Sequence, residues 1–319
     1  MALPCKLDII EELFGSREIE YFSCWDMIYE HLSQSLPQPT KMSLPYTAAG
    51  SFDPPLPTAE DVARGQNIRD HMRGPHWLYR VFDKYVVKFS TSQTILQEAE
   101  NLLYLEKNSK VRTPKVFAVY AHDGEDPFGW YPGTQTRFYY LVMEYITGTT
   151  LSSETWSTFD PGVQKIIGSK IAEQLKKLRE VRLESDPYYG RIYKQGWDPG
   201  FNMLTLPGNK ICGPYKSYED FVDAMYETAK FRAASGIGLF STPFSDRTLF
   251  TMINFKYSLN AVTAEDKLPT LTHLDLKLDN IMLQQDGDEY RVTIIDWECL
   301  GWMPAWVDAI RIGDRGRKA

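Results

Sequence analysis

Cysteine is scarce in this chain, and Cys5, Cys24, Cys212 and Cys299 lie far apart in the sequence. They form no Cys-x-x-Cys pair, so the sequence predicts neither a zinc site nor a disulfide framework. An excess of basic residues is also absent, because 35 Lys and Arg stand against 42 Asp and Glu and leave a net charge of −7. We therefore expect no nucleic-acid partner, whereas a cationic small molecule is compatible with this charge.

Long apolar runs are missing as well. No stretch of about 18 consecutive apolar residues is present, so no membrane-spanning helix is predicted. Asp8, Glu11 and Glu12 stand where a signal peptide would carry an unbroken apolar stretch. The sequence therefore predicts a cytoplasmic protein that binds no membrane, and it indicates no protein partner.

The chain has ample material for a core: 319 residues, of which 43% are hydrophobic and 13% aromatic. This length favours two domains or lobes. Residues 7–32 are predicted as helical, and a proline-rich segment over residues 37–57 is predicted as an extended connector. We expect residues 1–60 to form a helical appendage with this connector.

Strand patterns dominate the next part of the chain. Residues 78–90 are predicted as a β-hairpin that turns at Asp83 and Lys84. Apolar residues at helical spacing predict a helix over residues 94–108, which a weak capping box of Thr94 and Gln97 would begin. Strands are expected at 115–120 and 137–145.

The pattern becomes helical after Gly148. Apolar spacing predicts helices over 163–178 and over 218–229, the second opened by Ser217. A β-rich part with one helix, joined through Gly148 to a mostly helical part, indicates a two-lobed α+β arrangement.

One segment near the end of the chain suggests chemistry. After "HLDLKLDNIML" comes a turn signal at Asp286 and Gly287, and then the alternating strand "YRVTII". Asn280 and Asp296 are equidistant from the centre of this predicted hairpin, so we expect them side by side, roughly 5 Å apart at the backbone. Two oxygen ligands at one point suit Mg²⁺. Asp275, on the preceding loop, would approach an incoming hydroxyl group.

The spacing His-x-Asp-x4-Asn, a hairpin and then Asp resembles the catalytic segments of the protein-kinase-like superfamily. The sequence "THLDLKLDNIML" with "VTIIDWECLGWMP" is most similar to the aminoglycoside phosphotransferase family of small-molecule kinases, especially its fungal-type members. Those usually carry His-Gly-Asp, and here Leu274 replaces the glycine. The resemblance implies a bilobal protein-kinase-like fold, with a nucleotide-binding N-lobe over 61–147 and a larger, mainly helical C-lobe over 148–319 that carries a substrate-binding insert and the catalytic loop.

Lys88 stands in the strand "YVVKF", where a buried lysine needs an anion unless its side chain extends to water from an edge strand. The resemblance implies that Lys88 binds the α and β phosphates of ATP and is held by Glu98, with Glu100 as the alternative. It also implies that Met143 flanks the adenine, while the carbonyl of Glu144 and the amide of Ile146 bind the base.

The resemblance assigns catalysis to Asp275, which would orient the acceptor hydroxyl, and Mg²⁺ binding to Asn280 and Asp296. Lys277 either contacts the γ-phosphate or is a solvated loop lysine. His273 would brace the catalytic loop, and Asp308 would accept hydrogen bonds from its backbone.

Features of a protein kinase are missing: no GxGxxG, no DFG and no APE segment is present. A long segment containing "GPYKS", similar to that of fungal-type phosphotransferases, lies before the catalytic loop. We therefore predict an ATP- and Mg²⁺-dependent kinase that phosphorylates a hydroxyl of a small molecule. The alternative is a catalytically impaired nucleotide-binding or scaffold protein, favoured by Leu274 and by a chain that ends soon after Asp296. A protein kinase ranks third.

Overall fold

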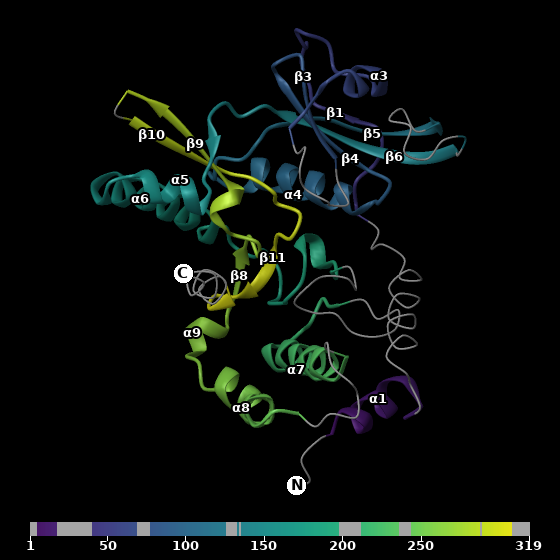
Figure 1. Ribbon diagram of the computed structural model, residues 1–319, viewed down its shortest axis with the longest axis vertical. Helices are drawn as coiled ribbons and strands as arrows, with labels where there is room; N and C mark the ends of the chain where they lie inside the picture. The colour runs from purple at the N-terminus through teal and green to yellow at the C-terminus, as the bar shows by residue number, and fades with distance from the viewer. Residues whose placement is uncertain are drawn as a thin grey trace. The chain divides into compact units, whose positions relative to one another are not determined.

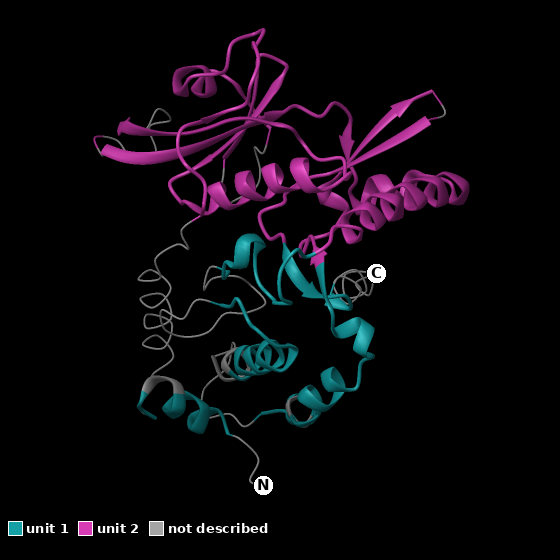
Figure 2. Cartoon of the chain, turned by 180° about the vertical axis from the view of Figure 1, so that it is seen from behind, with its two compact units in different colours: residues 1–38, 183–270, 301–307 teal, residues 39–182, 271–300, 308–319 magenta. Residues whose placement is uncertain are grey.

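The structure is a computed structural model, and it describes residues 5–17, 40–68, 77–125, 133, 135–197, 212–235, 244–287 and 289–307. The chain divides into two compact units (Figure 2). Unit 1 comprises residues 1–38, 183–270 and 301–307, and unit 2 comprises residues 39–182, 271–300 and 308–319. All predicted catalytic, nucleotide-binding and metal-binding residues that the structure describes belong to unit 2.

Unit 2 contains a six-stranded antiparallel sheet in the order β1-β5-β6-β4-β3-β2 (Figure 1). Its strands are β1 (Tyr46–Thr47), β2 (Gln66–Asn67), β3 (Trp77–Val81), β4 (Tyr85–Ser90), β5 (Val116–Glu125) and β6 (Gln135–Glu144). The predicted hairpin over residues 78–90 is confirmed as β3 and β4, with Val81 opposite Tyr85. Phe82 and Asp83 take positive φ angles of 54° and 53°, so they form the turn without a glycine.

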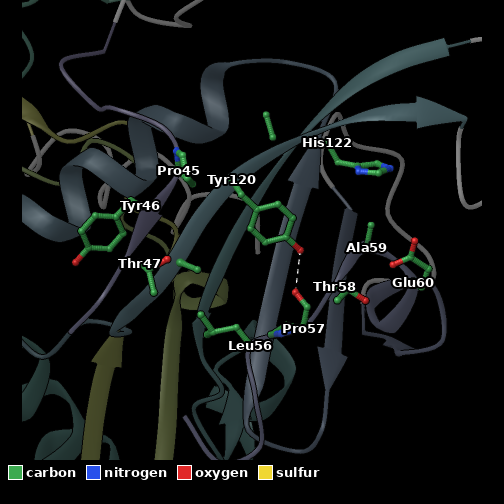
Figure 3. A pocket seen from close by; sticks show the side chains of 12 residues that line it. Pro45, Tyr46, Thr47, Leu56, Pro57, Thr58, Ala59, Glu60, Tyr120 and His122 are labelled. Carbon is green, nitrogen blue, oxygen red and sulfur yellow. Dashed lines mark hydrogen bonds between the residues drawn. The ribbon is translucent and has the colours of Figure 1, made fainter. Parts of the chain in front are cut away.

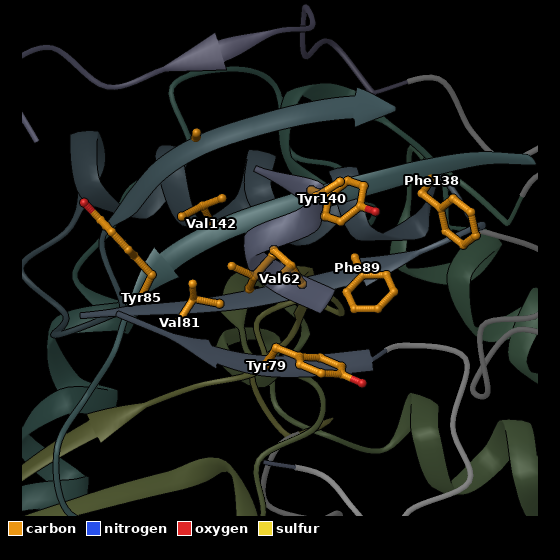
Figure 4. Packing of buried hydrophobic residues seen from close by; sticks show 11 residues of the cluster. Val62, Tyr79, Val81, Tyr85, Phe89, Phe138, Tyr140 and Val142 are labelled. Carbon is orange, nitrogen blue, oxygen red and sulfur yellow. The ribbon is translucent and has the colours of Figure 1, made fainter. Parts of the chain in front are cut away.

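Side chains alternate between the two faces of this sheet, and that alternation separates its core from its functional face. Tyr85, Val87 and Phe89 of β4 pack with residues of β6 and with helix α3 (Ala59–Ala63) in one buried cluster (Figure 4). Phe89 stacks on Tyr140 with ring centroids 5.3 Å apart. Lys88, between these core residues, therefore points to the opposite face.

Helix α4 (Thr94–Asn108) packs against β4, β5 and β6. Its predicted bounds are confirmed, but the predicted capping box is wrong. Gln93 is the N-cap and makes no side-chain cap, while the Thr94 amide donates to the Ser92 hydroxyl over 3.2 Å. The helix thus starts from a serine turn that precedes the predicted cap.

The proline-rich segment predicted as a connector joins the sheet of unit 2. Its strand β1 pairs with β5, with Tyr46 opposite Val119. Backbone carbonyls of the same segment accept hydrogen bonds from two tyrosine hydroxyls: Tyr85 donates to Pro54 over 2.6 Å and Tyr120 to Pro57 over 3.0 Å. Prolines lack the amide hydrogen that a central strand needs, so the segment binds through its carbonyls and at the sheet edge.

The rest of unit 2 forms the platform of the predicted catalytic segment. A second sheet has the order β10-β9-β7, and helix α6 packs against β10. The elements are β7 (Thr149–Thr150), α5 (Ser153–Thr158), α6 (Pro161–Arg179), the 3₁₀ helix η2 (Leu278–Asn280), β9 (Ile281–Asp286) and β10 (Glu289–Ile294). Gly148 precedes β7 with φ 118°, and a Cβ there would lie 2.3 Å from the carbonyl oxygen of Leu283, so only glycine fits.

Unit 1 is mainly helical in its described residues. It contains α1 (Lys6–Phe14), η1 (Ile192–Lys194), α7 (Tyr218–Ser235), α8 (Asp246–Asn260), α9 (Ala264–Lys267) and β11 (Gly301–Pro304), while β8 (Pro269–Thr272) begins in it. Helix α7 packs against both α1 and α8. The helix predicted over residues 7–32 ends at Phe14 because Gly15 takes the left-handed conformation, and residues 18–32 lie outside the described ranges.

The predicted start of α7 is confirmed, since the Ser217 hydroxyl accepts the Asp220 amide over 3.0 Å. In the part of the chain that the structure describes, no helix has both the length and the apolar character needed to span a membrane.

Candidate active site

The hairpin that carries the predicted metal ligands is confirmed, but its register differs from the prediction by one residue. Ile281 pairs with Ile294, and the Asn280 carbonyl accepts the amide of Ile295 over 2.9 Å. The expected cross-strand pairing of Asn280 with Asp296 is therefore wrong. Asp296 instead follows the strand in a left-handed conformation with φ 64°, which redirects its side chain.

The redirected Asp296 carboxylate reaches Lys88. Lys88 is 4% exposed, and its ammonium nitrogen lies 2.6 Å from Glu98, 2.9 Å from Asp296 and 3.2 Å from Glu298. Strand β4, helix α4 and the segment after β10 thus meet at one nitrogen atom. The buried-lysine prediction and the choice of Glu98 as its partner agree with this geometry.

The alternative partner, Glu100, is buried on α4 and accepts the backbone amide of Lys41 over 2.7 Å. Its carboxylate is directed to the segment before β1. Glu100 therefore binds the N-terminal part of unit 2 through the backbone of Lys41.

Electrostatics keep Lys88 charged. Burial alone would lower the pKa of Lys88, but the charges of Glu98, Asp296 and Glu298 raise it well above its ordinary value. Burial raises the pKa of Glu98, while the nearby Lys88 ammonium opposes this effect. A permanently cationic lysine among three acids can exchange partners with an incoming phosphate.

The oxygen donors of this cluster suit a divalent ion. One carboxylate oxygen from each of Glu98, Asp296 and Glu298 lies within 4.8 Å of the other two. Carboxylate oxygens are the ligands that Mg²⁺ prefers, and Asp296 and Glu298 retain solvent exposure. The residues present therefore fit a magnesium ion. Sequence reasoning did not select Glu298, although it stands two residues after Asp296.

A second group of side chains surrounds Asp275. Lys277 donates to its carboxylate over 2.9 Å. The Asn280 amide donates to the carbonyl and to the carboxylate of Asp275 over 2.8 and 3.0 Å. The nitrogen of the Asn280 amide is thus occupied, and its oxygen is the atom it can offer to a cation. The three predicted loop residues lie together around one carboxylate.

His273 and Ile295 connect the loop of Asp275 to the segment of Asp296. The Asp275 amide donates to Nδ1 of His273 over 3.2 Å, so Nε2 carries the hydrogen that the Ile295 carbonyl accepts over 3.0 Å. Burial lowers the pKa of this fully enclosed imidazole. A neutral ring with both nitrogens in structural hydrogen bonds agrees with the predicted bracing role.

Leu274 stands in a backbone conformation that glycine accepts more readily than leucine does. Its φ is 67°, a left-handed backbone that a Cβ disfavours, and its side chain is completely buried. Packing of the leucine side chain offsets the backbone strain. The loop thus retains, without a glycine, the turn that orients Asp275.

The predicted adenine-binding residues lie at the end of β6. Met143 lies opposite Val86 of the neighbouring strand β4. Val86 and Lys88 are two residues apart on β4 and share a face of the sheet, so Met143 lies on the same face as Lys88. The Glu144 carboxylate is held by Arg112 at 2.5 Å, and the Tyr145 amide donates to the Lys84 carbonyl over 3.0 Å. Ile146 is buried beside this fixed turn.

Asp308, which was expected to accept hydrogen bonds from the backbone of the catalytic loop, lies outside the described residues. A cavity of about 360 Å³ lies between the segment around β1 and α3 and strand β5, lined among others by Tyr46, Pro57, Tyr120 and His122 (Figure 3). None of its lining residues is a predicted site residue.

Comparison with known proteins identifies the family. The model of the phosphotransferase enzyme family, APH, matches residues 78–206 and 245–318, which is more than half of the chain. The chain therefore belongs to this phosphotransferase family. A comparison with curated protein sequences finds no match.

Solved structures show the fold. The structure is similar to a thermostable mutant of aminoglycoside phosphotransferase APH(4)-Ia, with a TM-score of 0.50 and 12% identity over 77% of this chain and 72% of that one. A putative aminoglycoside phosphotransferase from Ralstonia eutropha has a TM-score of 0.48 and 14% identity, over 94% and 70% of the two chains. Plasmodium vivax ethanolamine kinase has a TM-score of 0.41 and 19% identity, over 76% and 57%. The predicted α+β fold of protein-kinase-like phosphotransferases is confirmed by the first of these likenesses.

Proposed function

We propose that this phosphotransferase moves the γ-phosphoryl group of ATP to a hydroxyl group of a small molecule, with Mg²⁺ as the required ion. The contact of Lys88 with both Glu98 and Asp296 carries the proposal. Strand β4, the neighbouring helix α4 and a segment about two hundred residues further along the chain converge on one buried ammonium. Phosphoryl transfer requires such a preorganised charge for the nucleotide.

In this proposal Lys88 binds the α and β phosphates, and Glu98 holds the lysine in place. Met143 flanks the adenine, and the backbone of Glu144 and Ile146 binds its edge. Asp296, Glu298 and the amide oxygen of Asn280 are the residues that would hold Mg²⁺. The ion would neutralise the charge that develops on the transferred group.

Asp275 would accept the hydrogen bond of the acceptor hydroxyl and take up its proton as the new P–O bond forms and the bond from the γ-phosphorus to the bridging oxygen of ADP breaks, with ADP as the leaving group. Its carboxylate is held by Lys277 and Asn280, so its orientation does not depend on the substrate. Such fixed positioning supplies a large share of the acceleration in phosphoryl transfer. With ATP bound, Lys277 would turn from Asp275 toward the γ-phosphate, and the Asn280 amide would keep the carboxylate in place.

The acceptor is proposed as a hydroxylated small molecule, and the net charge of −7 is compatible with a cationic one. In this proposal residues 61–147 form a nucleotide-binding N-lobe and residues 148–319 form a substrate-binding C-lobe. We also propose that the protein is similar to the fungal-type members of the family, because it contains the segment "GPYKS".

An assay of ATP consumption with Mg²⁺, over a panel of hydroxylated amines, sugars and amino alcohols, tests this function. The function is supported if the wild-type protein turns over an acceptor and Asp275→Asn lowers that turnover by roughly 10²–10⁴. The thermal stabilisation of the protein by ATP, with Mg²⁺ and with EDTA, is measured alongside. Magnesium-dependent binding without turnover on any acceptor would instead support the non-catalytic alternative, and turnover on generic peptides would support a protein kinase.

A further inference from the structure

Asn101 is a buried polar residue of α4 that none of the roles above uses. Its side chain is completely enclosed, and its amide nitrogen donates to the carbonyls of Trp297 and Glu298 over 2.8 and 3.3 Å. These carbonyls follow directly after Asp296. One side chain of α4 therefore holds the backbone of the segment that carries the candidate metal ligands.

The environment of Asn101 makes this contact costly to lose. Its α4 neighbours Ala99, Leu102 and Leu105 are buried and apolar, and its amide oxygen has no hydrogen-bond partner among the described residues. A buried amide is stabilised only through the hydrogen bonds it makes. Without these two bonds the buried amide nitrogen of Asn101 would be unpaired, and the Trp297 carbonyl would keep only the amide of Leu300 at 3.3 Å.

The spacing on the helix explains what the contact can do. Glu98 and Asn101 are three residues apart, so they lie on the same face of α4. Glu98 binds Lys88, and Asn101 binds the backbone next to Asp296 and Glu298. Helix α4 therefore contacts Lys88 through Glu98 and the backbone beside Asp296 through Asn101. These two contacts together set the distance between the Lys88 ammonium and the carboxylates of Asp296 and Glu298.

We propose that Asn101 is a positioning residue of the phosphotransfer site: by holding the Trp297 and Glu298 carbonyls on α4, it places the Asp296 and Glu298 carboxylates where a divalent ion can bind with the nucleotide. This inference rests on the proposed function. It assigns Asn101 to magnesium-dependent binding and not to binding of the base.

Asn101→Leu tests the inference, because leucine has a similar size and no donor. Titration calorimetry with ADP is performed with Mg²⁺ and with EDTA. We expect the affinity in EDTA to change less than about twofold and the gain in affinity from Mg²⁺ to fall on the order of tenfold, as the loss of two hydrogen bonds implies. The kcat is expected to fall more than the KM for ATP rises.

Asn101→Asp provides a pH-dependent readout and a second variant if the leucine variant does not fold. Burial and the nearby acids should raise the pKa of the new carboxyl, so the comparison extends up to about pH 9. Where the carboxyl is ionised, it has no proton to donate to the two carbonyls, and the gain from Mg²⁺ should be lost. At lower pH the protonated acid donates again, and the gain relative to wild type at the same pH should partly return. A purely structural defect would not recover in this way.

Gln97→Leu is the matched control, since Gln97 is buried on the same helix and its amide nitrogen has no hydrogen-bond partner in the described ranges. It should keep the wild-type gain from Mg²⁺. Equal losses in the Gln97 and Asn101 variants, or no loss in Asn101→Leu, would overturn the proposal.

Hydrogen exchange separates this inference from the proposed function, because it needs neither nucleotide nor acceptor. The amides of residues 297–300 should exchange about tenfold faster in Asn101→Leu than in wild type and Gln97→Leu. If wild-type protein binds no nucleotide, the proposed function fails, while unchanged exchange in Asn101→Leu would show that Asn101 does not hold the segment.

Discussion

Replacing Lys88 by methionine should reveal how strongly the three acids depend on its charge. Methionine keeps most of the side-chain volume but removes the ammonium that lies 2.6 Å from Glu98, a residue only 3% exposed. Removing one partner of a buried ion pair costs about 3–5 kcal/mol, because the other charge is left uncompensated. Asp296 and Glu298 are more exposed and should add little to this loss.

The loss should depend on pH. Burial already raises the pKa of Glu98, and without Lys88 nothing opposes that effect. A carboxyl whose pKa is raised in the folded protein binds its proton more tightly there than in the unfolded chain. Its destabilising effect is complete above the folded-state pKa. The effect shrinks as the pH falls toward the pKa of the unfolded chain, near 4.5. The free energy of unfolding of Lys88→Met should therefore lie closest to wild type near the acid end of the accessible range.

Magnesium should partly replace the missing charge. With the ammonium gone, the three carboxylates within 4.8 Å of one another offer an uncompensated cation site. At ten times its Kd, an ion that binds only the folded state adds roughly 1.4 kcal/mol. Mg²⁺ should raise the stability of Lys88→Met by more than it raises that of wild type.

Urea unfolding, followed by tryptophan fluorescence at several pH values with and without Mg²⁺, measures these quantities. Lys107→Met, which removes an exposed lysine of α4, is the control and should behave as wild type. If Lys88→Met were as stable as wild type at about pH 8, or if its deficit were the same at about pH 5, the buried charge cluster would not have the importance that its geometry implies.

Three further predictions concern the loop of Asp275. Asp275→Asn should lower kcat by roughly 10²–10⁴ and retain ADP binding. Asp279→Asn, which changes an exposed residue close to Asp275, is the control and should keep wild-type turnover. Equal kcat values for the two variants would show that Asp275 is not a catalytic residue. Burial lowers the pKa of His273, so the stability it contributes is complete above about pH 6.5 and is lost as the pH falls below that value. In urea unfolding, His273→Gln should thus change less in stability between about pH 7.5 and 5.5 than wild type, and an equal change would contradict the neutral, braced ring. Leu274→Ala should lose about 2–5 kcal/mol of stability because a buried side chain is removed. Leu274→Gly should be more stable than Leu274→Ala by about 1 kcal/mol because glycine accepts φ 67°. If the alanine variant were the more stable of the two, the backbone at this position would not be strained.

Local patterns sufficed to predict several elements of this protein. The β3–β4 and β9–β10 hairpins and the bounds of α4 follow from alternation, turn residues and helical spacing, all of which act within a few residues. The residues next to Lys88 were also enough to predict its need for an anion. A lysine between core residues of one strand is buried when that strand packs in a sheet, and a buried ammonium needs an anionic partner.

Long-range contacts settled the rest of the site. The left-handed turn at Asp296 and the approach of Glu298 to Lys88 lie where segments about two hundred residues apart in the chain pack together. The Asn101 contacts with Trp297 and Glu298 have the same origin. Spacing along the sequence carries no information on which carbonyl a buried amide will meet, because that choice is made by the packing of α4 against the segment after β10.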